Sequence, residues 1–245
     1  MNDEPVNDDA AETPEVEASE VEAPPRFETY PHDSLVAALA RHRLEVPAER
    51  LDLLDRYCRL MWEWNEKINL TRHTDYERFV ARDVADSQQL AQLILPDEEV
   101  IDIGSGGGVP GIVLAILRPD LTITLTESIG KKSKVLLDMV RKLKLPIRVE
   151  ATRAEKVMED ERFDVTTARG VGSLAKLLRW LKEHWLGAGR LLAIKGPKWK
   201  GERGEARHYN LLNELELRVA ATYPLAGTNS ESVILKVWPK GAKER

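Results

Sequence analysis

A glycine-rich segment, residues 100–111, has the residue types and spacing of a ligand-binding loop. Its sequence is Val-Ile-Asp-Ile-Gly-Ser-Gly-Gly-Gly-Val-Pro-Gly. Glycines suit such a loop because they carry no Cβ, so they adopt positive φ and let a ligand approach the backbone. A dinucleotide fingerprint counted from Gly104 needs glycine in sixth place, where this chain has Val109. A phosphate-binding P-loop needs a Gly-Lys-Ser/Thr ending, and no lysine follows here. Neither of these two nucleotide-binding loops fits the segment.

The spacing Asp-x-Gly-x-Gly-x-Gly over residues 102–108 resembles the first motif of class I S-adenosylmethionine-dependent methyltransferases. Methyltransferases of this class place a ribose-binding carboxylate after the second strand, and Glu127 stands at that position, 23 residues beyond Gly104. We expect Asp102 to face the methionine ammonium, directly or through water. Because a sulfonium cofactor is a cation, flanking carboxylates suit it better than they suit a pyrophosphate. The loop and its acids therefore predict S-adenosylmethionine as the cofactor.

The elements that would position this loop follow from the hydrophobic pattern. Short apolar strands are predicted at residues 99–103, 121–126, 147–150, 163–167 and 190–194, with helices at residues 110–117, 131–143 and 171–184 between them. This alternation specifies a largely parallel sheet with helices on both faces. The late runs 216–223 and 232–238 have no helix between them and are predicted to form an antiparallel pair, which makes seven strands. Ligands bind at the carboxyl ends of the strands of such a sheet, where the glycine loop lies.

The chain is predicted to have three regions. Residues 1–25 hold nine acidic residues and no Lys or Arg, so we interpret them as a disordered acidic tail. Without them, 32 acidic residues remain against 36 basic ones, a net charge of +4. Residues 26–95 form an N-terminal helical region, and residues 96–245 form the Rossmann-like domain.

Two helices are predicted in the N-terminal region. An apolar stripe at spacings of three and four is made by Leu51, Leu54, Cys58, Met61 and Asn65. The second helix spans residues 76–94, with Asp75 as its N-cap and with Phe79, Val80, Val84 and Leu90 facing inward.

Composition excludes several classes of protein. Hydrophobic residues are 42 % of the chain and charged residues 31 %, as in ordinary globular proteins. The longest apolar run, residues 111–117, is far shorter than the ~20 residues of a membrane-spanning helix. Cys58 is the single cysteine, which excludes an internal disulfide and a multi-cysteine metal site. We therefore expect a cytoplasmic protein without a membrane segment.

Besides the glycine loop, the chain has a series of short motifs in a characteristic order: Trp64-Asn65, Asn69-Leu70-Thr71, Asp86-Ser87, Glu127-Ser128, Lys131-Lys132, Arg153-Ala154-Glu155, Ala168-Arg169 and Lys195-Gly196. In their order and spacing these motifs resemble one family, the bacterial small-subunit rRNA (guanine-N7)-methyltransferases, also called glucose-inhibited division protein B. The resemblance implies a class I methyltransferase fold and transfer of a methyl group to N7 of a specific guanine in 16S rRNA. The small ribosomal subunit or its RNA would be the partner.

The same resemblance implies the cofactor site. Its expected residues are Gly104, Val109, Glu127, Ala154, Glu155 and Arg169, and the glycine-loop motif adds Asp102, Gly106 and Gly108. Of these, Arg169 would lie near the transferred methyl group and position the reactants. The chain departs from the family pattern at Asp83, where the family usually has histidine, and at Gly170, where it usually has alanine.

The expected reaction needs no general base. Guanine N7 has a lone pair and no proton, so the protein must align the reactants and exclude water. Consistent with this, the sequence contains no convincing Ser–His–Asp, Cys–His or metal-ligand set, and no metal is expected.

RNA binding is predicted from basic residues with an interleaved aromatic. The predicted RNA-binding residues are Lys131, Lys132, Lys195, Lys198, Trp199 and Lys200. Those at 195–200 are expected to form a loop that leaves the sheet on the cofactor side, with Trp199 able to stack on an exposed base. A monomer is expected.

Three alternatives stay open at this point. They are a methyltransferase of another acceptor, a non-catalytic RNA-binding factor in ribosome assembly, and a dehydrogenase. The last alternative rests on the class of fold alone. The mismatch at Val109 argues against the dehydrogenase.

Overall fold

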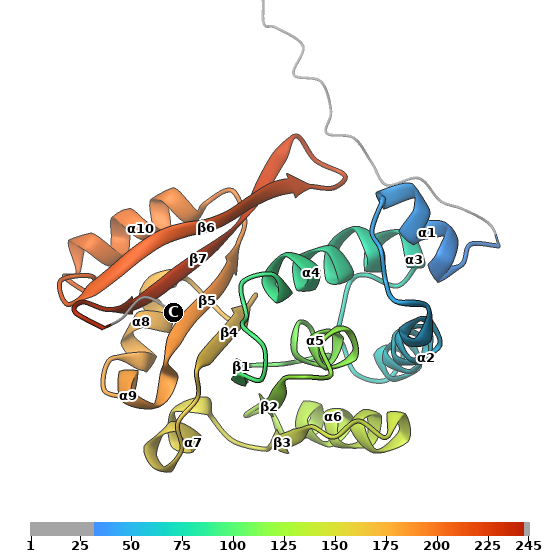
Figure 1. Ribbon diagram of the computed structural model, residues 1–245, viewed down its shortest axis with the longest axis horizontal. Coiled ribbons are helices and arrows are strands. Elements are labelled where there is room, and N and C mark those ends of the chain that lie inside the picture. The colour runs from blue at the N-terminus through green and yellow to red at the C-terminus, as the bar shows by residue number, and fades with distance from the viewer. Residues whose placement is uncertain (1–31, 243–245) are drawn as a thin grey trace, which may run out of the picture.

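The computed structural model describes residues 32–242, so the predicted acidic tail at residues 1–25 lies outside the described part of the chain. A seven-stranded sheet forms its centre (Figure 1). The strands are β1 (Glu99–Ile103), β2 (Thr122–Thr126), β3 (Arg148–Glu150), β4 (Val165–Arg169), β5 (Arg190–Lys195), β6 (Leu215–Leu225) and β7 (Ser230–Pro239). Their order is β3-β2-β1-β4-β5-β7-β6, with β7 antiparallel to both of its neighbours and the other pairs parallel. The predicted mostly parallel sheet with a closing antiparallel pair is confirmed.

Helices cover both faces of the sheet. They are α1 (Leu35–His42), α2 (Ala48–Asn65), α3 (Tyr76–Arg78), the π-helical segment η1 (Phe79–Val84), α4 (Ala85–Ala91), α5 (Gly111–Leu117), α6 (Gly130–Leu143), α7 (Ala154–Asp160), α8 (Leu174–Leu181), α9 (Trp185–Ala188) and α10 (Trp199–His208). None of the helices in residues 32–242 has the length and apolarity needed to cross a membrane.

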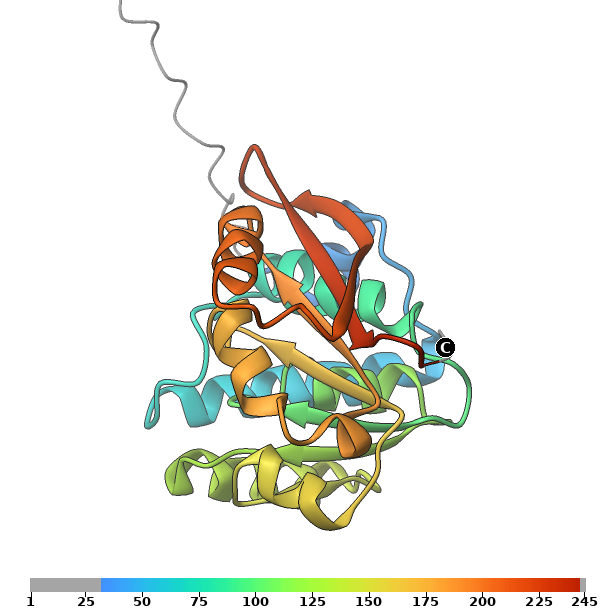
Figure 2. The same ribbon diagram turned by 90° about the vertical axis from the view of Figure 1, so that its left-hand side faces the viewer.

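The core has two layers because successive strand residues point to opposite faces of the sheet. On β1, Val100 packs in a cluster with α1, α2, η1 and α4 to α6, whereas Ile101 packs in a second cluster with α7 to α10. Figures 1 and 2 show the sheet between these two sets of helices. The N-terminal helices therefore share their core with the sheet that carries the glycine loop.

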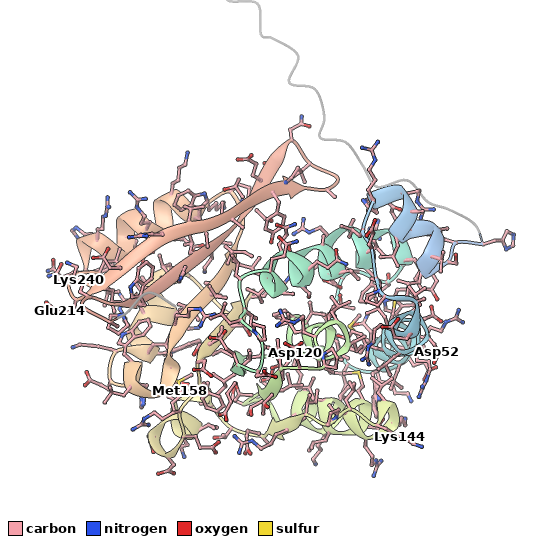
Figure 3. All side chains as sticks on the ribbon, in the orientation of Figure 1. Asp52, Asp120, Lys144, Met158, Glu214 and Lys240 are labelled. Carbon is pink, nitrogen blue, oxygen red and sulfur yellow. The ribbon has the colours of Figure 1, made fainter. Side chains whose placement is uncertain are left out.

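The β6–β7 hairpin closes the sheet and reaches beyond the other strands (Figures 1 and 2). At its open end Lys240 and Glu214 lie together, and the amide of Lys240 donates to the carbonyl of Glu214 at 2.9 Å (Figure 3).

The structure differs from the sequence-based prediction in several helices. Asp75 is the predicted N-cap and accepts from the amide of Arg78, but the helix that follows passes through η1 and ends at Ala91. The period-3.6 pattern cannot show such a π-helical segment, a feature often found at functional sites. Helices α1, α7, α9 and α10 were also not predicted as separate elements. Of these, α7 and α10 are short and highly charged, so their sequences carry a weak apolar period.

Candidate active site

The glycine loop joins β1 to α5 and is tied to neighbouring elements by its own backbone. The amide of Ser105 donates to the carbonyl of Thr126 at 3.0 Å, and Tyr57 of α2 donates to the carbonyl of Gly107 at 2.9 Å. Gly108 has φ +101°, and a Cβ there would lie 2.5 Å from Ile112, so this turn requires glycine. A Cβ on Gly106 would meet only the Gly104 carbonyl, at 3.7 Å, and would occupy the space in front of the loop. The loop therefore keeps an open cradle for a ligand, as the expected cofactor requires.

A cavity of about 600 Å³ lies in front of this cradle. It is lined by the loop (Gly104, Ser105, Gly106, Gly107 and Val109), by segment 70–73, by Arg82, Asp83 and Asp86, by Lys132, by Arg169 and Gly170, and by Lys195, Gly196 and Glu202. These residues come from the loop after β1, the segment between α2 and α3, η1 and α4, the ends of β4 and β5, and helices α6 and α10. The cavity thus lies at the carboxyl ends of the parallel strands, where an α/β sheet binds ligands.

Arg169 is held in this cavity by two carboxylates. Its guanidinium lies 2.6 Å from Oδ1 of Asp83 and 2.8 Å from Oδ2 of Asp86. Both acids are almost fully buried, and Tyr223 of β6 donates to Asp86 at 2.8 Å. Burial lowers the pKa of Arg169, but the two carboxylates more than offset it and the pKa is raised. The guanidinium is therefore charged and fixed at the end of β4.

The departure of the chain from the family pattern at Asp83 has a structural counterpart. Nδ1 of His73 lies 2.8 Å from Oδ1 of Asp83, so an imidazole from another segment stands beside this position. Burial raises the pKa of Asp83, but Arg169 and His73 together reverse the shift and lower it. Asp83 is therefore an ionised, buried carboxylate. The other departure, Gly170, has φ +68°, a conformation that alanine would adopt only with strain.

Asp102 does not line the cavity, contrary to the expectation that it faces the cofactor ammonium. Its carboxylate is fully buried behind the loop, where Thr167 donates to Oδ1 at 2.7 Å. Burial raises the pKa of Asp102 to about 6. Its place beneath Gly111 suits a role in holding the loop rather than in direct contact with a ligand.

Glu127 lies beside the loop, at the end of β2, where the sequence predicts a carboxylate. Its Oε2 accepts from the amide of Gly106 at 3.1 Å and its Oε1 from the amide of Ile129 at 2.8 Å. Ala154 and Glu155 begin α7, after β3, and are outside the cavity lining. The cavity lining therefore contains the loop and Arg169, whereas the residues expected near the adenosine are not part of it.

The predicted RNA-binding residues differ in their exposure to solvent. Lys131, Lys198 and Lys200 are exposed, and Lys132 lines the cavity. Lys195 is not the exposed cation that the prediction requires, because it is buried at the end of β5 with its ammonium 2.9 Å from Glu202.

The predicted loop at residues 195–200 is also shorter than expected. Helix α10 begins at Trp199, whose ring is half-buried against the second core and lies beside Lys200 and Arg203. Less of the ring is available for base stacking than a loop position would leave.

Sequence reasoning missed several residues of the cavity and its surroundings, namely Arg72, His73 and Arg82 in the lining and Tyr223 behind Asp86. One signal for this region was present: Asp83 and Asp86 fall among the inward-facing apolar residues of their helix, and a buried acid requires a cationic partner. The pattern does not say which cation supplies it.

The sheet order and the cavity at the strand ends define a class I methyltransferase fold. A solved structure, a point mutant of MtNAS in complex with S-adenosylmethionine, matches it with a TM-score of 0.50 and 14 % identity, covering 84 % of each chain, which is a likeness of fold alone.

Comparison with relatives in sequence identifies the family within this class of fold. The "Ribosomal RNA small subunit methyltransferase G" of Rhodopirellula baltica is 54 % identical over 194 residues, 79 % of this chain and 84 % of that protein. The protein of the same name from Thermobifida fusca is 38 % identical over 165 residues, 67 % of this chain and 70 % of that protein. The family model for rRNA small subunit methyltransferase G matches residues 50–224. The chain belongs to this family of S-adenosylmethionine-dependent methyltransferases.

Proposed function

We propose that this protein transfers a methyl group from S-adenosylmethionine to N7 of a specific guanine in small-subunit (16S) rRNA. The observation that carries the proposal is a cavity that contains both the glycine cradle and a set of basic side chains from several elements. The cradle suits the cofactor, and the cations suit an acceptor that belongs to a nucleic acid. The printed names of the relatives agree with this acceptor.

The residues would act by position and charge. When bound, S-adenosylmethionine supplies an electrophilic methyl group on its sulfonium. Guanine N7 has a free lone pair, so a C–N bond forms as the C–S bond breaks and no proton is removed. The glycine loop would hold the cofactor, and Arg169, clamped by Asp83 and Asp86, would fix the geometry at the end of β4. Because the methylated base is a cation, the net negative charge of the group formed by Asp83, Asp86 and Arg169 would also favour the charge that develops on it.

Several finer points belong to this proposal. Glu127, Ala154 and Glu155 would bind the adenosine part of the cofactor, next to Gly104, Gly106, Gly108 and Val109. The exposed Lys131, Lys198 and Lys200, with Lys132, would contact the RNA. We propose a cytoplasmic monomer that needs no metal, with residues 26–95 as its helical region and residues 96–245 as its Rossmann-like domain.

The test is transfer of labelled methyl groups to unmodified small-subunit particles and to their extracted RNA. Borohydride and aniline treatment cleaves RNA at N7-methylguanine and maps the product. A single cleavage site is the expected result. Label that enters the RNA without cleavage, or enters another acceptor, would contradict N7 methylation. Binding of cofactor and RNA without any transfer would indicate a non-catalytic factor.

A further inference from the structure

The acids and bases that line the cavity do not balance. Its acids are Asp83, Asp86 and Glu202: the first two share the single charge of Arg169, which leaves one negative charge there, and the third pairs with Lys195. The cations Arg72, Arg82 and Lys132 also line the cavity, and no residue within 32–242 gives them an anionic partner. The charge left over in the cavity is therefore positive.

These three cations come from three separate elements. Arg72 is exposed on the segment between α2 and α3, Arg82 lies in η1, and Lys132 lies in the first turn of α6. They reach one cavity only because the fold brings these elements together. Bringing three like charges together does not stabilise the folded protein, because like charges at one site repel each other.

Arg82 gives a second and independent indication of a ligand. Its Nε is buried and has no hydrogen-bond partner among the described residues. A buried donor without an acceptor costs free energy, so a ligand that supplies an acceptor to this guanidinium would relieve that cost. A guanidinium has several donors in a fork, which suits phosphate oxygens.

The cofactor by itself cannot balance this charge. S-adenosylmethionine has one carboxylate, which neutralises one of the three cations at most, and its sulfonium and ammonium are themselves positive. Because the cofactor as a whole is a cation, its binding leaves the excess of positive charge in the cavity in place. The phosphates of an RNA strand supply several negative charges at regular spacing, and a base that enters an enzyme cavity brings the phosphates on either side of it to the rim.

We propose that Arg72 and Arg82, together with Lys132, form a clamp for the RNA phosphates that flank the target nucleotide. This inference rests on the proposed function, because it takes RNA as the acceptor. It adds Arg72 and Arg82 to the RNA-binding residues and places RNA contacts at the cavity itself, in addition to those on the outer surface.

The test compares Arg72→Gln, Arg82→Gln and Lys132→Gln with a matched control, Lys134→Gln. Lys134 is exposed on the same helix as Lys132 and is not part of the cavity lining. RNA affinity is measured against KCl concentration with unmodified small-subunit rRNA, and cofactor affinity is measured by titration calorimetry. Circular dichroism checks the fold, and Arg82→Lys keeps the charge at the partly buried position.

Each of the three glutamine variants should weaken RNA binding and make the plot of log affinity against log salt shallower by about 0.7 for a single-stranded contact. Lys134→Gln and Arg82→Lys should keep the slope of the unchanged protein. Cofactor affinity should stay the same in all of them. If Arg82→Gln does not fold, the exposed Arg72 still decides the question.

Unchanged salt slopes in Arg72→Gln and Arg82→Gln would overturn the clamp. So would a loss of cofactor affinity larger than the loss of RNA affinity, since these cations would then hold the carboxylate of the cofactor. The clamp and the proposed function fail separately: if the unchanged protein does not methylate guanine N7, the function fails, whatever the variants do to RNA binding.

Discussion

At the scale of single residues, the site depends on charges that are buried and paired. Arg169 is the cation shared by Asp83 and Asp86, with its guanidinium in contact with both. Two carboxylates placed this close together resist ionising at the same time unless a cation lies between them. The arginine therefore stabilises the folded protein as well as positioning the reactants.

Replacing this cation should destabilise the protein in a pH-dependent way. Arg169→Gln removes the arginine from two buried carboxylates, and we expect a loss of about 3–5 kcal/mol in unfolding free energy near neutral pH. The folded-state pKa of Asp83 is lowered, so this stabilisation is present above the pKa of the unfolded chain and is lost as pH falls through the folded value. Urea unfolding of both proteins checks it, because their difference should shrink towards low pH. Equal stability at neutral pH would contradict the argument.

Asp102 should show the opposite dependence. Its pKa rises from 3.8 to about 6 on folding. The folded state therefore binds the proton more tightly, and the stability from this group falls as pH rises through that window. The shift corresponds to roughly 3 kcal/mol. Asp102→Asn keeps an acceptor for the Thr167 hydroxyl but has no carboxyl to ionise. The unfolding free energy of the variant, relative to that of the unchanged protein, should therefore rise by roughly 3 kcal/mol between about pH 4 and pH 7.

The control for this experiment is Asp52→Asn. Asp52 points outward from α2 (Figure 3), with 84 % of its side chain exposed. The plot of unfolding free energy against pH for Asp52→Asn should run parallel to that of the unchanged protein. A parallel curve for Asp102→Asn as well would show that the buried carboxyl does not titrate as described.

At the scale of elements, the loop depends on close contact between α5 and the sheet. Gly111 begins α5, and a Cβ there would lie 2.2 Å from Leu125 of β2 and 3.0 Å from Asp102. Leu125 is fully buried, so it has little space into which to move. The glycine therefore sets the distance between the helix and the strands that hold the cradle.

Gly111→Ala should cost about 1–3 kcal/mol because it overpacks this contact. The matched control is Gly201→Ala in α10, where a Cβ meets nothing within 4 Å. That variant should instead gain about 0.5–1 kcal/mol, since alanine favours the helix. Thermal unfolding of the two variants checks both signs. A neutral Gly111→Ala would mean that α5 is free to move away from β2.

At the scale of the whole molecule, the surface charge separates RNA binding from cofactor binding. Lys198 and Lys200 are exposed where the chain leaves β5, whereas the cradle is formed by the loop after β1. Removing both charges, as Lys198→Gln with Lys200→Gln, should weaken RNA binding and lower the salt slope by about 1.4 in total. Cofactor affinity should not change, because neither lysine lines the cavity. Equal loss of cofactor binding in calorimetry would refute this separation.

Local patterns were sufficient for much of the fold. Short apolar strands, the Asp75 cap and the glycine loop depend on neighbours within a few residues, and the structure has all of them. The first residues of helix α10 were predicted as part of a loop and no helix was predicted after them, because the glycines and charges of this segment give it low helix propensity. It forms because Ala206 is buried and Trp199 packs on the second core, contacts that the local sequence does not reveal.

The sequence by itself determined the class of fold, the loop and the cofactor, since a strand–loop–helix unit with that glycine spacing is a local arrangement. The tertiary structure alone decided how the charges pair. Thr167 reaches Asp102 across 65 residues, and Tyr223 reaches Asp86 across 137. Such contacts turn Asp102 away from the cavity and bury Lys195 against Glu202, and within residues 32–242 they leave the buried Nε of Arg82 without an acceptor. Pairing of charges depends on distance in space, and only the folded chain sets that distance.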